Sequence, residues 1–342
     1  MKIVLFGDTH LGIDWPLRPR IERRRRGDDF YNNYLSVIHR AEKEAADLVI
    51  HGGDLFFRSR IPQWLVVKAF DPLIGLADRG IQVLLIPGNH ERSQIPLSLF
   101  AKHPNLHIFD KPKTIIHRVD QRRIGFSGFP FCRENPRDRF PELLQSTLWQ
   151  ETEADIRFLC IHQAIEGATV GPKNFQFLRG ADVVRTRDIP DEFTAILSGH
   201  IHRFQVLRKD PRGKALTTPV FFPGSLERTS IAEADEPKGF LLLDISSSLL
   251  HYEFIELPAR PMVEIKIPFE TIGPGDGIIQ YLREQIGTLD PNSIVRVKVE
   301  KKLTDLPINL PGNVLLRSIA PPTMNIELVL PRSSPPRHPL HS

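Results

Sequence analysis

Short apolar runs alternate with amphipathic segments along the first two hundred residues. Five runs are apolar and too short for buried helices, which predicts buried strands at residues 2–6, 48–50, 81–86, 156–161 and 193–197. Apolar residues at helical spacing predict one helix from Asp28 or Asp29 to about residue 45, and another over residues 62–79. Strands that alternate with helices predict an α/β fold with parallel strands.

Later segments are richer in β-structure. Short β-like runs occupy residues 106–131, and a helix is predicted over residues 142–150 with Trp149 on its apolar face. After residue 202, strands follow one another without helices, at residues 204–208, 219–222, 240–244 and 249–254. This pattern predicts a second sheet that packs against the first.

The chain beyond residue 257 has its own pattern. Residues 258–261 are typical of a linker, and alternating strands at residues 262–267, 293–299 and 325–330 accompany a helix near residues 277–286. We therefore predict a main domain over residues 1–257 and a small α/β domain over residues 258–330. Residues 331–342 are rich in Pro and Ser, and we expect this tail to be disordered.

Polar residues directly follow the predicted buried strands. Open α/β sheets bind ligands at the carboxyl ends of their strands, and the residues in that position here are Asp8, His10, Asp54, Asn89, His90, His162, His200 and His202. Asp8 and His10 lie two positions apart, so an extended backbone would direct both side chains to the same face. Five of the 13 histidines occupy such positions, which chance does not explain.

These residue types predict a pair of metal ions. Asp, Asn and His ligands without cysteine suit Mn²⁺ or Fe²⁺, with Zn²⁺ as a further alternative. One ion would take Asp8, His10, His202 and Asp54; the other would take Asp54, Asn89, His162 and His200. Asp54 is then the shared, bridging ligand. Two ions about 3.5–4 Å apart clamp a phosphate and lower the pKa of a bridging water. His90 would bind a phosphate oxygen or protonate the leaving alkoxide.

A cluster of arginines follows the first strand end. A formal net charge of +4 and a pI of 9.1 permit a polyanionic partner without requiring one. Six arginines would bind nucleic acid backbone or would simply form a solvated surface: Arg18, Arg20, Arg23, Arg24, Arg25 and Arg26.

Two further observations bear on location and redox chemistry. No apolar run approaches the roughly 20 residues of a membrane helix, and the apolar N-terminal segment is too short for a signal peptide. We therefore expect a cytoplasmic protein without a membrane partner. Cys132 and Cys160 lack the neighbours of a zinc knuckle, so buried thiols are predicted.

The motifs resemble those of a known superfamily. Gly7-Asp8-Thr9-His10, Gly53-Asp54, Gly88-Asn89-His90-Glu91, His162 and Gly199-His200-Ile201-His202 resemble the five motifs of calcineurin-like metallophosphoesterases. Gly53-Asp54-Leu55-Phe56, Pro223 to Arg228 and Arg260-Pro261-Met262-Val263 are similar to segments of SbcD-type DNA repair exonucleases. The resemblance implies a two-layer β-sandwich flanked by helices, a C-terminal capping domain, two Mn²⁺ ions and hydrolysis of DNA.

The chain departs from the family pattern in three places. Phe57 stands where the family commonly has a histidine that helps to seat the substrate phosphate, and Glu91 replaces the usual aspartate. Family members bind an SMC-like ATPase through a helical segment after the cap, whereas this chain has a proline-rich tail, so the sequence does not support that partnership. By family analogy the helix from Asp29 would mediate a homodimer; alternatively, Tyr31, Tyr34 and Ile38 are ordinary core.

The leading hypothesis is a phosphodiesterase that acts on DNA ends or single strands, with a metal-bridging hydroxide as the nucleophile. Asp54 and His90 would be its catalytic residues. The five motifs alone do not select a substrate, so hydrolysis of a small phosphoester is an alternative. A metal-free scaffold that binds proteins is a third hypothesis, which the filled ligand positions disfavour.

Overall fold

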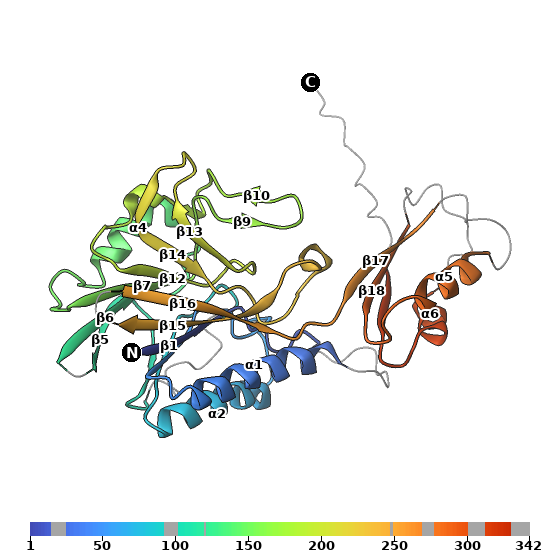
Figure 1. Cartoon of the computed structure of the whole chain (residues 1–342), viewed down its shortest axis with the longest axis horizontal. Helices are drawn as coiled ribbons and strands as arrows, with labels where there is room; N and C mark the ends of the chain where they lie inside the picture. The colour runs from blue at the N-terminus through green and yellow to red at the C-terminus, as the bar shows by residue number, and fades with distance from the viewer. Residues whose placement is uncertain are drawn as a thin grey trace. The chain divides into compact units, whose positions relative to one another are not determined.

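The computed structural model describes residues 1–14, 25–91, 102–119, 121–246, 249–268, 277–299 and 312–329. Two compact units divide between Ala259 and Arg260 (Figure 1). The predicted roles of a nuclease domain and a capping domain stay predictions. The predicted tail at residues 331–342 lies outside the described residues.

The first sheet of the larger unit has six strands. Its order is β16 (Leu249–Leu257), β15 (Lys238–Ser246), β1 (Lys2–Phe6), β2 (Leu48–His51), β3 (Gln82–Leu85) and β4 (Leu106–Ile108). Strands β1 to β4 are parallel, whereas β15 pairs antiparallel with both β1 and β16. The carboxyl ends of β1, β2 and β3 therefore meet at one edge.

The second sheet also has six strands. Its order is β13 (Gln205–Lys209), β14 (Ala215–Phe222), β12 (Ala195–Ser198), β7 (Ile156–Ile161), β6 (Arg122–Gly128) and β5 (Lys113–Val119). Strands β14, β12, β7 and β6 are parallel, and the two outer strands are antiparallel. A second sheet is present as predicted, but it also contains strands that precede residue 202. The strands predicted for it at residues 240–244 and 249–254 are wrong in this respect, because β15 and β16 lie in the first sheet.

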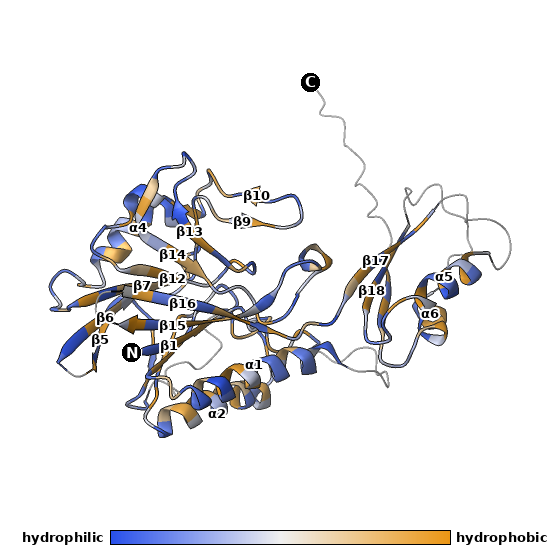
Figure 2. Cartoon of the chain, viewed as in Figure 1, coloured by the Kyte–Doolittle hydropathy of each residue, from blue (hydrophilic) through white to orange (hydrophobic). Residues whose placement is uncertain are grey.

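Alternate residues along the central strands face opposite layers. Ile3 and Leu5 of β1 join Phe126 and Phe158 of the second sheet in a buried core between the sheets, whereas Val4 faces the helices. The rings of Phe126 and Phe158 are stacked at 5.4 Å. Apolar segments concentrate in this interior (Figure 2). The predicted two-layer β-sandwich flanked by helices is confirmed.

Helices cover the outer faces of the sheets. The first sheet carries α1 (Arg26–Lys43) and α2 (Gln63–Asp78), and α4 (Pro136–Gln145) packs on the second. The predicted start of α1 at Asp28 or Asp29 is wrong, because the helix begins at Arg26; both aspartates lie inside its first turn, where their charges favour the helix dipole. No helix in the described residues is long and apolar enough to cross a membrane.

The position predicted for α4 is wrong. A helix was expected over residues 142–150, but it begins at Pro136, a favoured residue for a first turn, and ends at Gln145. Leu148 has a φ of 57°, which a continuing helix does not accommodate. Trp149 is buried, as expected, but from a turn beyond the helix.

The buried core also includes residues of α1 for which the sequence left two interpretations, core or dimer interface. Tyr34 and Ile38 of α1 are buried in the core, so a partner chain does not have access to them, whereas Tyr31 is only partly buried. Homodimer formation stays a prediction. Cys132 and Cys160 are free buried thiols, as predicted.

Short elements of the larger unit escaped prediction. Four two-residue strands lie between β7 and β12: β8 (Ala164–Ile165), β9 (Thr169–Val170), β10 (Phe175–Gln176) and β11 (Val183–Val184). Two 3₁₀ turns also escaped prediction: η1 (Thr186–Asp188) lies between β11 and β12, and η2 (Ile231–Glu233) lies between β14 and β15. Two residues are too few to produce a readable hydrophobic period.

The smaller unit is a three-stranded parallel sheet with two helices. Its strands are β17 (Met262–Ile267), β18 (Ile294–Val299) and β19 (Asn325–Val329), and its helices are α5 (Gly277–Gly287) and α6 (Asn313–Ile319). The buried Arg260 guanidinium donates to the Asn292 carbonyl oxygen at 2.6 Å and to Asn325 Oδ1 at 2.6 Å. Arg260 therefore fastens the start of this unit to two of its turns.

Candidate metal centre

The loops after β1 and β2 continue the pairing of their strands. The Asp8 amide donates to the Gly53 carbonyl oxygen at 2.8 Å, and the His10 amide donates to the Asp54 carbonyl oxygen at 3.0 Å. These bonds hold Asp8, His10 and Asp54 at the same edge of the first sheet. The parallel strands of the second sheet place His162 and His200 in the same region.

The backbone here adopts an uncommon conformation. Asp8, His10 and Asp54 have φ values of 49°, 49° and 53°, and His200 has a φ of 80°. These four are half of the eight non-glycine residues with positive φ in the described chain. Such conformations carry strain and gather at functional sites. The predicted extended geometry of Asp8 and His10 is therefore wrong, although their side chains do converge.

Two glycines permit the close approach of these loops. A Cβ atom on Gly53 would lie 2.2 Å from His162 Nδ1, and one on Gly88 would lie 2.3 Å from Asp54 Oδ1. Either contact would push a candidate ligand away. Glycine is thus required beside Asp54 in both loops.

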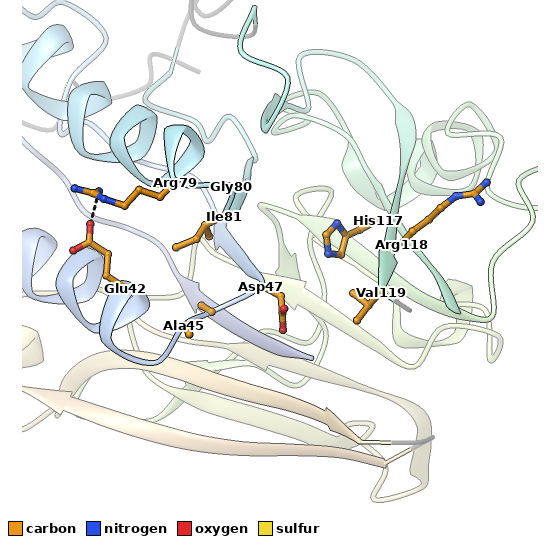
Figure 3. Close-up of a pocket in the computed structure, with 10 residues that line it drawn as sticks. Glu42, Ala45, Asp47, Arg79, Gly80, Ile81, His117, Arg118 and Val119 are labelled. Atoms are coloured by element: carbon orange, nitrogen blue, oxygen red, sulfur yellow. Dashed lines mark hydrogen bonds and ion pairs between the residues drawn. The ribbon is translucent and has the colours of Figure 1, made fainter. Parts of the chain in front are cut away.

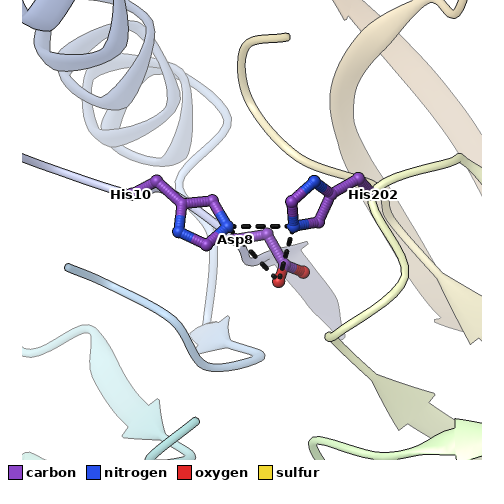
Figure 4. Close-up of side chains that lie close together, drawn as sticks. All are labelled: Asp8, His10 and His202. Atoms are coloured by element: carbon purple, nitrogen blue, oxygen red, sulfur yellow. Dashed lines mark hydrogen bonds and ion pairs between the residues drawn. The ribbon is translucent and has the colours of Figure 1, made fainter. Parts of the chain in front are cut away.

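One cluster joins Asp8, His10 and His202 (Figure 4). The two imidazole Nε2 atoms lie 2.9 Å apart, and Asp8 Oδ1 lies 3.9 Å from His10 Nε2 and 3.7 Å from His202 Nε2. Asp8 is fully buried, and its other oxygen accepts the His200 amide hydrogen at 3.0 Å.

A second cluster centres on Asn89. Its Oδ1 lies 3.2 Å from His162 Nε2 and 3.0 Å from His200 Nδ1. Asp54 lies between the clusters: it shares one group with Asp8 and His162, and another with His10 and His90. Its Oδ2 lies 3.5 Å from His162 Nε2 and 3.7 Å from His90 Nε2. All eight residues predicted for the centre are therefore brought together.

Fixed acceptors orient several of the imidazoles. The Gly52 carbonyl oxygen accepts from His162 Nδ1 at 2.7 Å, and the Phe57 carbonyl oxygen accepts from His90 Nδ1. A carbonyl oxygen only accepts, so each Nδ1 carries the hydrogen and each Nε2 faces the cluster. Metal-binding histidines characteristically have such a partner on the other ring nitrogen.

The partner of His202 was missed in the sequence. Glu233 Oε1 lies 3.1 Å from His202 Nδ1, and Thr229 Oγ1 donates to the same oxygen at 2.5 Å. The buried Lys238 ammonium donates to Glu233 Oε2 at 2.6 Å and to Glu236 Oε2 at 3.3 Å. Glu233 is in a 3₁₀ turn 31 positions from His202, and no motif marks it.

Glu91 binds backbone amides of the loops that follow β2 and β3. Its carboxylate accepts amide hydrogens from Asp54 at 2.9 Å, Phe56 at 3.0 Å and Gly88 at 2.7 Å. Burial and the nearby Asp54 charge raise the pKa of Glu91 to about 8. This residue thus ties the Asp54 loop to the loop that carries Asn89 and His90.

Burial and mutual charge set the protonation of the centre. Burial raises the pKa of Asp8 to about 6 and lowers the pKa of His200 to about 3. Burial also lowers the pKa of His162, but the Asp54 carboxylate outweighs it and raises that pKa to about 9. The same pairing holds the pKa of Asp54 well below its ordinary value, against the effect of burial.

The donor set fits a divalent cation. Asp8 Oδ1 is buried and has no hydrogen-bond partner in the structure, yet it faces two imidazole nitrogens. A buried carboxylate oxygen requires compensation, which a cation among these atoms would supply. The residues present therefore fit the predicted metal; their role as ligands stays a prediction.

The predicted arginine cluster is only partly described. Arg18, Arg20, Arg23 and Arg24 lie outside the described residues. Arg25 directly precedes α1, and the Arg26 guanidinium donates to the Arg228 carbonyl oxygen and lies 5.6 Å from the centre of the Phe30 ring. Arg26 is therefore engaged within the fold, and the DNA-binding role of the cluster stays a prediction.

Phe57 lies at the rim of the centre. Its ring centre is 5.8 Å from that of His10 and 6.1 Å from that of His90. A phenyl ring donates no hydrogen bond to a phosphate. Phe57 therefore cannot take the phosphate-seating role that the resemblance gives to a histidine at this position.

A hollow lies at the opposite edge of the first sheet (Figure 3). Its volume is about 610 Å³, and its lining includes Asp47 and Ile81, which precede β2 and β3, together with His117. Among the described residues, none of the three candidate metal groups includes a residue of this lining. The hollow and the candidate metal centre therefore share no residue in the described part of the chain.

Sequence relatives share one name. Proteins called DNA double-strand break repair protein Mre11 are 27% identical over 72% of this chain in Methanococcus maripaludis and 26% identical over 81% in Aeropyrum pernix. The corresponding protein of Sulfurisphaera tokodaii is 26% identical over 93% of the chain. The chain spans 63% and 65% of the length of the first two relatives.

The family assignment rests on a family model that matches the part of the chain holding the motifs described above. The model of the calcineurin-like phosphoesterase family matches residues 1–204, which is more than half of the 342 residues. This match includes every candidate ligand from Asp8 to His202. The predicted superfamily and its fold are confirmed: the chain belongs to the calcineurin-like phosphoesterase family.

Proposed function

We propose that this protein hydrolyses DNA phosphodiester bonds with two divalent metal ions. The position of Asp54 between two groups of ligand atoms carries the proposal, because one carboxylate can bridge two cations. Family membership implies a metal-dependent phosphoesterase. The relatives named as DNA double-strand break repair proteins favour DNA as the substrate.

The seven ligands divide into two sets that share Asp54. One set is Asp8, His10, His202 and Asp54; the other is Asp54, Asn89, His162 and His200. Oxygen and imidazole ligands without thiolate favour Mn²⁺. When bound, two such ions supply positive charge to the phosphate and a water of lowered pKa. Fixed backbone acceptors and Glu233 hold the imidazoles ready for this role.

His90 is the candidate general acid. Its amide donates to Asp54 Oδ1 at 2.9 Å and its Nδ1 is held by the Phe57 carbonyl oxygen, so its Nε2 faces the centre. The ring is partly exposed, which leaves room for substrate beside it. A protonated His90 would donate from Nε2 to a phosphate oxygen or to the leaving alkoxide.

Removing the bridging charge tests the proposal. We expect Asp54→Asn to lose Mn²⁺ from both positions and to reduce hydrolysis of a labelled DNA strand by more than about 100-fold, because an amide oxygen bridges cations poorly. Circular dichroism should remain native, since asparagine still accepts from the His90 amide. Asp47→Asn is the matched control, because Asp47 precedes the same strand at the opposite edge.

Bound Mn²⁺ is counted by elemental analysis after dialysis. Undiminished turnover by Asp54→Asn would contradict the bridging role. Cleavage of a small chromogenic diester without cleavage of DNA would instead retain the metal centre and reject DNA as the substrate.

The pKa of His162 predicts the pH dependence of metal binding. A raised pKa of about 9 means that the metal-free imidazole is protonated at pH 7. A metal needs its lone pair, so binding releases this proton, and Mn²⁺ affinity should rise as pH rises from 7 to 8, by up to about tenfold. Calorimetry in two buffers of different ionisation enthalpy measures the release. A flat affinity with no proton release would exclude this role for His162.

Glu233 provides a test of positioning. We expect Glu233→Gln to weaken Mn²⁺ binding by about 10- to 100-fold, because the charged partner that orients His202 is lost. Glu236→Gln is the matched control: it removes another carboxylate from Lys238 but leaves the His202 partner unchanged. Equal losses in both variants would indicate a general effect on the buried ion pairs rather than orientation of His202.

A further inference from the structure

A second pocket of the larger unit is rich in arginine. It has a volume of about 450 Å³ and lies among the segments that follow β8, β10 and β11 and the turn between β13 and β14. Half of its ten lining residues are arginines: Arg137, Arg179, Arg185, Arg187 and Arg212. Its lining carboxylates are Glu166 and Asp210.

Internal pairs leave part of this positive charge uncompensated. Arg137 pairs with Glu166 at 3.1 Å, and Arg185 pairs with Asp138 at 2.5 Å and Asp188 at 3.3 Å. Asp210 Oδ1 is occupied by two backbone amides of its own turn.

Three arginines of the pocket can contact an external anion. The Arg187 side chain is 77% exposed, and its Nε pairs at 3.7 Å with Asp188, a carboxylate that it shares with Arg185. Within the described part of the chain, no carboxylate lies within ion-pair distance of Arg179 or Arg212. Guanidinium groups bind phosphate oxygens in pairs, so the pocket suits a phosphate-bearing ligand.

An exposed aromatic residue lies three positions from the pocket lining. Phe175 of β10 is 63% exposed, and Leu178, which does line the pocket, is 45% exposed. The Phe175 and Phe177 rings form a T-shaped pair with centres 5.5 Å apart, and Phe175 still keeps most of its surface exposed to a planar ligand. Cationic side chains beside an open aromatic ring are the combination that binds single-stranded nucleic acid, through backbone phosphates and base stacking.

Strands β9 and β10 pair with each other as a hairpin. Direct contacts connect this β9–β10 hairpin to the residue that follows a candidate metal ligand. Arg203 follows the candidate ligand His202, and its guanidinium donates to Asn174 Oδ1 at 2.7 Å and to the Gly171 carbonyl oxygen at 2.7 Å. Asn174 directly precedes Phe175. Glu166, in the pocket lining, is only four residues beyond His162, which limits their separation to about 14 Å.

We propose that the arginine pocket and Phe175 bind a single strand of DNA that extends from the metal centre. Arg179, Arg187 and Arg212 contact its phosphates, and a base stacks on Phe175. This proposal rests on the proposed DNA phosphodiesterase function. It assigns the strand a path over the short β8–β11 region, which lies outside the five phosphoesterase motifs.

Salt dependence of binding tests the phosphate contacts. For the double variant Arg179→Gln/Arg212→Gln, we expect the slope of log affinity against log salt to fall in magnitude by about 1.4, for two contacts on a single strand. Fluorescence anisotropy with a labelled single-stranded oligonucleotide measures the slope. The matched control is Lys43→Gln/Arg118→Gln, which removes two exposed charges at the opposite edge of the sheet.

Phe175→Ala tests stacking. We expect affinity for the single strand to fall at least about fivefold while affinity for a blunt duplex stays unchanged, since paired bases are not available to stack on the ring. Trp64→Ala, which removes an exposed aromatic from α2, is the control.

The outcomes separate this site from the proposed function. Hydrolysis of a chromogenic diester with Mn²⁺ should be unchanged in the arginine and Phe175 variants, because they leave the candidate ligands intact. If these variants keep the wild-type salt slope and the wild-type affinity for single-stranded DNA, or if the controls lose as much, the proposed strand-binding role of the pocket is rejected. The proposed DNA hydrolysis is not affected by that result. A wild-type protein that cleaves the small diester but neither binds nor cleaves DNA would overturn both.

Discussion

Two buried carboxylates surrounded by imidazoles are the constraint on which this structure depends. Asp8 and Asp54 are almost completely inaccessible to solvent, and a carboxylate in such a place is costly unless opposite charge lies near. Five histidines approach them, but backbone or side-chain acceptors already hold one nitrogen of His90, His162 and His202. Compensation is therefore incomplete at Asp8 Oδ1, and a cation held there would complete it.

The packed sheets of the larger unit stabilise the unfavourable backbone of the loops that carry these carboxylates and imidazoles. Left-handed backbone at Asp8, His10, Asp54 and His200 is unfavourable in an isolated chain, yet each lies directly beyond a buried strand of a packed sheet. The glycines beside Asp54 allow the loops to approach, and Glu91 closes three of their amides behind the centre. Apolar burial in two sheets thus stabilises a local geometry that the loops alone would not adopt.

Sequence reasoning reached the strand ends but not the reason for their convergence. Buried parallel strands can be predicted from the sequence, because a strand covered on both faces is a nearly continuous apolar run, and the polar residues that follow it mark its end. The φ of 49° at Asp8 has no comparable signal in the sequence, so the predicted extended backbone was wrong. Glu233 was missed because its relation to His202 is created only by the tertiary fold, as are the two-residue strands between β7 and β12.

The division between chemistry and substrate choice follows from the same architecture. The centre is built at the carboxyl ends of buried strands of the two packed sheets, where a displaced side chain would leave buried charge unpaired. The arginine pocket and the β9–β10 hairpin are built from two-residue strands and turns, and the exposed Phe175 and Arg187 side chains contribute little to stability. Because these residues are not candidate metal ligands, the proposed recognition of a polymer can change here while the candidate ligands are kept.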